Sequence, residues 1–159
     1  MVGAKMAVIE IENLRNTIPH GRRLLGLDVG TKTVGLALSD SIWTVATPHE
    51  TIRRTKFTKD AAHLFALVDD RDVGGLVIGL PVNMNGTEGP RCQSVRQFAA
   101  NLLKLRDIPI VFWDERWSTA AAERALLEAD TSRRKRADVI DKVAASYILQ
   151  GALDRLKSS

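Results

Sequence analysis

Apolar and polar residues alternate along the chain with two different periods, which predict where strands and helices lie. Three short apolar runs come first and predict strands over residues 22–29, 33–39 and 43–46, the last extending toward Ile52. The first two runs are joined by the short piece Gly30-Thr31-Lys32-Thr33, which is typical of a hairpin. The fold is therefore expected to begin with three consecutive strands.

The rest of the chain alternates between helical and strand patterns. Apolar residues at helical spacing predict helices over residues 58–70, 92–106, 118–128 and 138–156, and compact apolar runs predict strands over residues 76–80 and 108–114. The order βββαβαβαα predicts an α/β fold with a mixed five-stranded sheet flanked by helices. The first three strands are expected to be antiparallel, and those joined through helices parallel. Such sheets gather ligands at the carboxyl ends of their strands.

Length and composition indicate one folded domain. The chain has 159 residues, of which 45% are hydrophobic and 26% charged, and it contains no apolar stretch long enough to span a membrane. We expect an N-terminal extension over residues 1–21, without the pattern of a signal peptide, and a domain over residues 22–157. A single cysteine forms no disulfide within the chain, so the cytoplasm is the expected compartment. The net charge of +4 permits a polyanionic partner without requiring one.

Asp28 is a carboxylate inside an otherwise apolar predicted strand. With a period of two, the apolar residues on either side of it share one face of the strand, and Gly26 and Asp28 share the other. Burial of an unpaired carboxylate is costly, so this position indicates a cation or hydrogen-bond donors beside it. A cap on the turn at Gly30 is the alternative, structural interpretation.

Two further pairs of acids occur at the ends of predicted elements. Asp114 and Glu115 close the fifth strand, where successive side chains point to opposite faces, so one of them faces the candidate site. The strand pattern does not choose between them, and the extra methylene of Glu115 would let it reach a metal beside Asp28. Asp138 and Asp141 lie on one flank at the predicted start of the last helix, where the helix N-terminus favours the ionised form. A turn for the first pair and a helix cap for the second are the structural alternatives.

Together, acids from the first strand, a later strand end and the last helix predict a metal site. Carboxylates with open positions suit Mg²⁺ or Mn²⁺, and two such ions about 3.5–4 Å apart can activate a water and stabilise the leaving oxygen of a phosphodiester. No cluster of cysteine and histidine competes in the sequence, because Cys92 is alone and the three histidines are scattered. The acids therefore predict a metal site of a kind that can support phosphodiester cleavage.

Polar and basic residues near these acids are candidates for binding nucleic acid. The loop over residues 83–89 offers amide donors just before a helix, where a phosphate can bind, although it is equally an ordinary connection. The basic run over residues 133–136 precedes the helix of Asp141 and can hold a nucleic-acid backbone, although such runs are also common on solvated surfaces. Trp117 is a candidate for stacking on a base. The candidate binding residues are Lys32, Asn83, Asn85, Arg116, Arg133, Arg134, Lys135 and Arg136.

Four ordered blocks of the sequence resemble the YqgF/RuvX family, over about residues 22–156. The blocks cover residues 26–32, 77–89, 114–119 and 139–145. The resemblance implies an RNase H-like fold and a bacterial cytoplasmic nuclease of the Holliday-junction-resolvase type, with 5′-end processing of precursor 16S rRNA as its cellular role. It further implies that Asp28, Glu115 and Asp141 are the metal ligands. Trp117 stands where the family often has Leu, and residues 1–20 lie outside the resemblance.

Other classes of function remain open from the sequence alone. Residues 28–31 also resemble the first phosphate loop of sugar kinases and actin-like ATPases, but those proteins need two lobes and this chain supplies one. A non-catalytic module that binds RNA or a ribosomal particle is a further alternative, against which the three intact acids argue. A basic surface and carboxylates recognise backbone and shape, so precursor rRNA and branched DNA both remain candidate substrates. The sequence likewise leaves open a monomer or a homodimer, and predicts no membrane partner.

Overall fold

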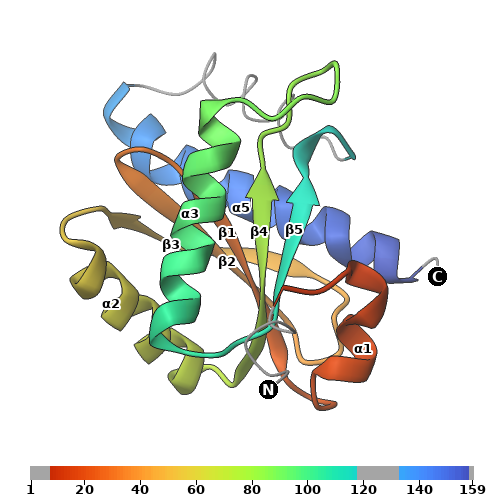
Figure 1. Cartoon of the computed structure of the whole chain (residues 1–159). Helices are drawn as coiled ribbons and strands as arrows, with labels where there is room; N and C mark the ends of the chain where they lie inside the picture. Colours follow the sequence, from red (N-terminus) through yellow and green to blue (C-terminus); the bar gives the residue numbers. More distant parts are fainter. Residues whose placement is uncertain (1–7, 118–132, 158–159) are drawn as a thin grey trace.

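Five strands form one mixed sheet in the computed structural model, which describes residues 8–117 and 133–157 without the side chains of residues 133–138. The strands are β1 (Arg23–Val29), β2 (Thr33–Ser39), β3 (Ala46–Arg53), β4 (Val73–Leu80) and β5 (Ile110–Asp114). Their order across the sheet is β3-β2-β1-β4-β5 (Figure 1). The pairs β1–β2 and β2–β3 are antiparallel, whereas β1–β4 and β4–β5 are parallel. The predicted mixed five-stranded sheet is thus confirmed.

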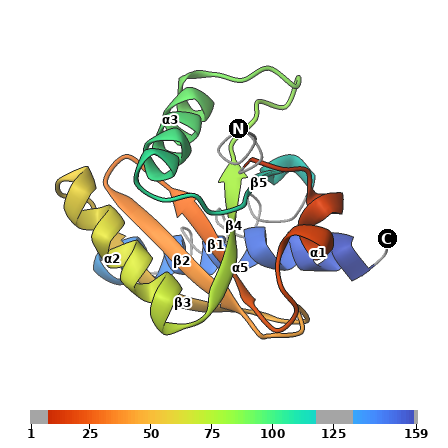
Figure 2. The same cartoon turned by 60° about the horizontal axis from the view of Figure 1, so that its bottom comes forward.

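Helices cover both faces of this sheet. The helices α2 (Phe57–Asp70) and α3 (Pro90–Leu105) lie on one face, and α5 (Arg133–Lys157) crosses the other (Figure 2). The alternation in β1 explains the two layers, because Leu25 belongs to the core under α2 and α3 while Leu24 belongs to the core under α5. None of the described helices has the length and apolar character needed to cross a membrane.

The segment before β1 packs on the α5 side of the sheet. It contains a short helical turn, η2 (Ile11–Asn13), and the short helix α1 (Leu14–Thr17). The backbone N–H of Ile9 donates to the carbonyl oxygen of Ile110 at 2.9 Å, at the outer edge of β5. Part of the expected N-terminal extension therefore contributes to the core. The buried side chains that it supplies are Ile11, Leu14 and Ile18.

The last helix starts earlier than the sequence pattern predicts. α5 begins at Arg133, so the predicted start at residue 138 is wrong and the run 133–136 lies in the first turn of the helix instead of preceding it. Arg, Lys and Ala are good helix formers, and the residues between Arg133 and Asp138 include neither proline nor glycine. Asp138 is therefore not a helix cap. Asp141 lies about two turns inside the helix, beyond the range of the charge effect expected at its N-terminus.

The third strand starts later than predicted, at Ala46 instead of residue 43. The preceding residues form a turn in which a carboxylate oxygen of Asp40 accepts a hydrogen bond from the backbone N–H of Thr44 at 2.6 Å. The indole N–H of Trp43 donates to the carbonyl oxygen of Arg22 at 2.7 Å, so Trp43 is buried as part of this turn.

The predicted helix over residues 118–128 lies outside the described residues, and the remaining predicted elements are present with ends shifted by a few residues.

Candidate active site

Asp28 lies near the carboxyl end of β1, on the face of the sheet that α5 covers. It is buried, with 5% of its surface exposed. Its partner on the antiparallel strand β2 is Gly35, and the register of β1 with β4, which pairs Leu27 with Ile78, places Gly79 level with Asp28 on its other side. Because glycine has no side chain, neither neighbouring strand presents one beside Asp28 in this row.

The glycine in β2 allows α5 to approach the sheet closely at Asp141. A Cβ atom on Gly35 would lie 2.0 Å from the main-chain oxygen of Asp141, so the helix backbone rests directly on the strand. The hydroxyl of Thr33, two residues earlier on β2, donates a hydrogen bond of 2.5 Å to Oδ2 of Asp141. Asp141 is thus held over β2, one strand away from Asp28 and on the same face.

The glycine in β4 leaves room for the carboxylate of Glu115. Glu115 begins η3 (Glu115–Trp117), the helical turn that follows β5. A Cβ atom on Gly79 would lie 3.1 Å from Oε2 of Glu115 and 2.4 Å from Cδ1 of Ile148 in α5, so Glu115 reaches back over β4 on the α5 face. The three acids therefore lie over three adjacent strands, with Asp28 on β1, Glu115 over β4 and Asp141 over β2. We call these three acids the carboxylate row.

The donor chemistry of the carboxylate row suits a hard divalent cation. Carboxylate oxygens are the side-chain ligands that Mg²⁺ and Mn²⁺ prefer. The glycines on both sides of Asp28 let the backbone of α5 and the carboxylate of Glu115 come close to the strands beside it. Within residues 8–117 and 139–157, where side chains are described, no group of three or more His, Cys, Asp or Glu side chains is arranged so that it could hold a metal ion as it stands. The three acids share a location, and their use as ligands stays a prediction.

Asp114 and Glu115 lie on opposite faces of the sheet, as the alternation along β5 predicts. Asp114 lies with Phe112 on the α3 side, where Nη2 of Arg116 donates to its Oδ2 at 2.6 Å and the backbone N–H of Arg116 donates to its Oδ1 at 2.9 Å. Burial acts to raise the pKa of Asp114, but the hydrogen bonds and charge of Arg116 hold that pKa below its usual range. Arg116, a predicted nucleic-acid contact, is thus paired with Asp114.

The other predicted nucleic-acid contacts are placed in three parts of the molecule. In the loop after β4, Nδ2 of Asn83 donates to Oγ1 of Thr87 at 3.0 Å, and the Thr87 hydroxyl donates to Oδ1 of Asn85 at 2.6 Å, so both amides help to shape the loop. Lys32 is exposed in the turn between β1 and β2, close in sequence to Asp28. The side chains of the run 133–136 lie outside the described ones.

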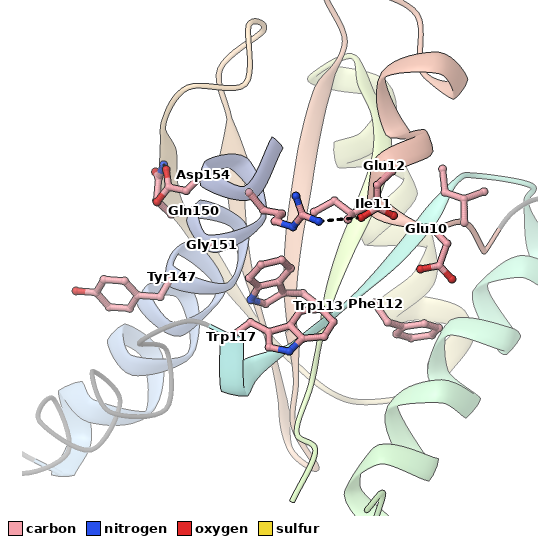
Figure 3. A pocket seen from close by; sticks show the side chains of 12 residues that line it. Glu10, Ile11, Glu12, Phe112, Trp113, Trp117, Tyr147, Gln150, Gly151 and Asp154 are labelled. Atoms are coloured by element: carbon pink, nitrogen blue, oxygen red, sulfur yellow. Dashed lines mark hydrogen bonds and ion pairs between the residues drawn. The ribbon is translucent and has the colours of Figure 1, made fainter. Parts of the chain in front are cut away.

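A hollow of about 730 Å³ opens beside β5, on the α5 side of the sheet (Figure 3). Trp113, Trp117 and Tyr147 line it, and Trp117, which is 64% exposed, meets Trp113 edge-on with ring centroids 5.2 Å apart. No member of the carboxylate row lines this hollow, and its acidic rim does not favour a phosphate backbone. Trp117 stays a candidate for stacking at its edge. The charged residues of the rim are Glu10, Glu12, Asp154 and Arg155.

Thr33, Gly35 and Gly79 belong to the site and were not predicted as part of it. A glycine in the interior of an apolar strand weakens the strand and often marks a close approach by a ligand or another backbone, so both glycines carried a usable signal. Thr33 carried none, because its partner Asp141 lies 108 residues further along the chain.

Gly35→Ala is expected to weaken the fold at the carboxylate row. The added methyl group would overlap the main-chain oxygen of Asp141, and a helix backbone cannot rotate aside as a side chain can. Overpacking of this kind costs about 1–3 kcal/mol, and we expect the upper end of that range in the free energy of unfolding measured with denaturant.

Gly89→Ala is the matched control for this change. A Cβ atom on Gly89 would meet only Asn83, at an ordinary contact distance of 3.5 Å, so we expect a small effect on stability. If Gly35→Ala and Gly89→Ala left the free energy of unfolding equally close to that of the wild type, the close approach of α5 at Asp141 would be refuted.

The sequence of the chain matches a known protein family. The family model RuvX, described as Holliday junction resolvase, matches residues 22–155. The matched range runs from just before β1 to near the end of α5, so it contains the whole carboxylate row.

Curated relatives are similar over nearly their full length. A protein of Paramagnetospirillum magneticum named "Putative pre-16S rRNA nuclease" is 63% identical over 149 residues, covering 94% of this chain and 96% of the relative. A protein of a Ruegeria species with the same name is 62% identical over 146 residues, covering 92% of this chain and 93% of the relative.

Solved structures of much lower identity share the fold. RuvC of Thermus thermophilus in complex with a Holliday junction substrate has a TM-score of 0.53 at 9% identity, covering 85% of this chain and 96% of the other. A second RuvC structure of T. thermophilus has a TM-score of 0.52 at 11% identity, covering 86% of this chain and 97% of the other. These similarities support the fold alone, and the expected RNase H-like fold is confirmed.

Proposed function

The chain belongs to the RuvX family of Holliday junction resolvases, and from this membership we propose that it is a metal-dependent endonuclease that hydrolyses phosphodiester bonds in structured nucleic acid. The substrate we propose is precursor 16S rRNA, and the proposed reaction is the processing of its 5′ end. The proposed place of action is the cytoplasm. Relatives more than 60% identical to the chain carry the corresponding name. The observation that supports the reaction class is the carboxylate row.

A four-way DNA junction is the second candidate substrate. The matching family is described as Holliday junction resolvase, and T. thermophilus RuvC has been solved in complex with a Holliday junction substrate. The RNA substrate is preferred, because the relatives that carry the rRNA name share far more of this sequence than the RuvC structures do. Both substrates present the same phosphodiester to the same carboxylates.

The three acids suit a Mg²⁺ or Mn²⁺ site for reasons of position and rigidity. A divalent metal bound there would activate a water molecule and stabilise negative charge on the scissile phosphate and its leaving oxygen. Asp28 is fixed by β1, Glu115 reaches over Gly79 from the end of β5, and Asp141 is oriented by the hydroxyl of Thr33. Side chains on strands and helices hold their positions better than side chains on loops do, which metal-assisted chemistry requires.

The start of α5 supplies positive charge along the same helix as Asp141. The run 133–136 precedes Asp141 by five to eight residues, or about 8–12 Å along the helix axis. Lys32 adds a further cation at the turn that follows Asp28 and Gly30. We assign these residues to the nucleic-acid backbone, since contacts to phosphates position a substrate without reading its sequence.

A cleavage assay on matched substrates tests the proposed function. The purified protein is incubated with RNA that carries the 5′ extension of 16S rRNA, and with a four-way DNA junction, in Mg²⁺, in Mn²⁺ or in EDTA. We expect cleavage of the RNA with either metal and none in EDTA. Cleavage of the junction alone would favour the resolvase, whereas tight binding without cleavage in any metal would refute the enzyme and favour a non-catalytic RNA-binding module.

A further inference from the structure

A second polar hollow lies on the α3 side of the sheet, directly beyond the end of β1. It measures about 370 Å³ and is formed by the end of β1, the segment between β3 and α2, and the first turns of α3. Among the residues that the structure describes, no carboxylate lines it. We call it the arginine hollow. Its charged and hydroxyl-bearing side chains are Thr31, Arg54, Thr55, Arg91 and Ser94.

Both arginines are held in place by main-chain oxygens at the end of β1. Nη1 of Arg54 donates to the carbonyl oxygen of Gly30 at 2.6 Å, and its guanidinium lies over the ring of Phe98, 5.2 Å from the ring centroid. Nη2 of Arg91 donates to the carbonyl oxygen of Val29 at 3.4 Å. Neither arginine forms an ion pair with any of the described residues, so no described carboxylate neutralises their charge.

This donor set fits a phosphate group. Guanidinium groups carry several N–H donors in a fixed plane, and the described hydrogen bonds of Arg54 and Arg91 use one nitrogen of each. The exposed hydroxyls of Thr31 and Ser94 add neutral donors on the same lining. We propose that the arginine hollow binds a backbone phosphate of the nucleic-acid substrate, next to the phosphodiester that the carboxylate row cleaves. This inference rests on the proposed function.

The position of the hollow explains why a neighbouring phosphate is the expected ligand. Asp28 faces α5, whereas the next residue, Val29, faces the α3 side and lines the hollow. Strand residues rise about 3.3 Å each, so the hollow begins within about 10 Å of Asp28, around the tip of β1. A nucleic-acid strand that crosses this tip would place one phosphate at the carboxylate row and another in the arginine hollow. Such a contact would fix the position of the substrate along the site without recognising its base sequence.

Salt dependence of binding tests the arginine hollow. The wild type and the double variant Arg54→Gln/Arg91→Gln are compared by their Kd for the 5′-extended RNA in EDTA, so that binding is measured without cleavage, between about 50 and 200 mM salt. Loss of one phosphate contact lowers the log–log slope by about 0.7–0.9, so we expect a slope smaller by that amount. The corresponding rise in Kd at about 0.1 M salt is about fivefold or more.

The double variant Arg71→Gln/Arg106→Gln removes the same charge from another part of the molecule. Arg71 follows α2 and Arg106 follows α3, and each pairs with an exposed carboxylate, of Asp70 and Asp69 respectively. We expect this variant to keep the slope of the wild type. An equal fall in slope for the two double variants would show an effect of net charge alone and would overturn the proposal.

Ser94→Glu tests the hollow without disturbing the hydrogen bond of Arg54. Ser94 is exposed on α3, so glutamate is compatible with the helix and places a negative charge beside the two arginines. We expect weaker RNA binding than for Ser94→Ala, with unchanged melting temperatures, and equal Kd values for the two variants would refute the hollow. If the wild type cleaves the RNA and all variants of the arginine hollow bind it with the Kd of the wild type, only the proposal for the arginine hollow is refuted. If the wild type binds neither RNA nor the junction, the proposed function falls as well.

Discussion

Asp28→Asn is expected to abolish metal-dependent cleavage while the fold stays intact. The amide keeps the shape of the carboxylate but loses the negative charge that a divalent cation requires. Loss of a residue that merely orients a metal ligand costs about 10–100-fold in activity or affinity, so loss of a ligand itself should cost at least about 100-fold. The assay is the initial rate of RNA cleavage in Mg²⁺, with circular dichroism and the melting temperature measured on the same preparation.

Asp60→Asn is the matched control for Asp28→Asn. Asp60 is also a buried aspartate, but it lies on α2, where its carboxylate accepts hydrogen bonds from the backbone N–H of Thr55 at 3.1 and 3.3 Å. Its replacement should lower the free energy of unfolding by about 1 kcal/mol through these bonds and leave the cleavage rate unchanged. Cleavage by Asp28→Asn at the wild-type rate, or loss of its secondary structure, would make Asp28 a structural residue and not a ligand.

Glu115→Gln is expected to abolish cleavage, whereas Asp114→Asn only reduces it. The two carboxylates are adjacent in sequence, but Oε2 of Glu115 lies over Gly79 on the face of Asp28, and Asp114 is bound to Arg116 on the opposite face. The comparison tests the assignment directly, since both changes remove one negative charge and the two positions are adjacent in sequence, at the end of β5 and the start of η3. If Asp114→Asn is inactive and Glu115→Gln is active, the assignment of Glu115 as a ligand is wrong, while the proposal of a metal-dependent nuclease still holds. Full activity in both variants would refute the carboxylate row as the active site.

The pH dependence of stability separates the structural role of Asp114 from catalysis. Because Arg116 lowers the pKa of Asp114 in the folded state, the pair stabilises the protein above the pKa of the unfolded carboxyl group, whose usual value is 3.8. This stabilisation is lost as the pH falls through the lower, folded pKa. We expect about 1 kcal/mol of difference between wild type and Asp114→Asn near neutral pH, and a smaller one under strongly acidic conditions. An unchanging difference across this range would contradict the ion pair.

Local patterns in the sequence already determine the layers of the fold, and they identify Asp28 as a carboxylate inside an otherwise apolar strand. Alternation along β1 predicts that Leu25 and Leu27 share one face and that Gly26 and Asp28 share the other. In the structure the two leucines lie in the core under α2 and α3, and Gly26 faces α5. The same alternation predicts that Asp114 and Glu115 diverge, because successive side chains of a strand point to opposite faces. Such properties depend only on backbone geometry over a few residues, which is why they can be read without a structure.

Tertiary packing alone decides what surrounds Asp28. Strand register places Gly35 and Gly79 on either side of it, and register depends on pairing between segments far apart in the chain. The approach of α5 then brings Asp141 to the hydroxyl of Thr33, a contact that no local pattern encodes. Side-chain periodicity thus determines the face on which an acid lies, while long-range packing determines which other acids share that face.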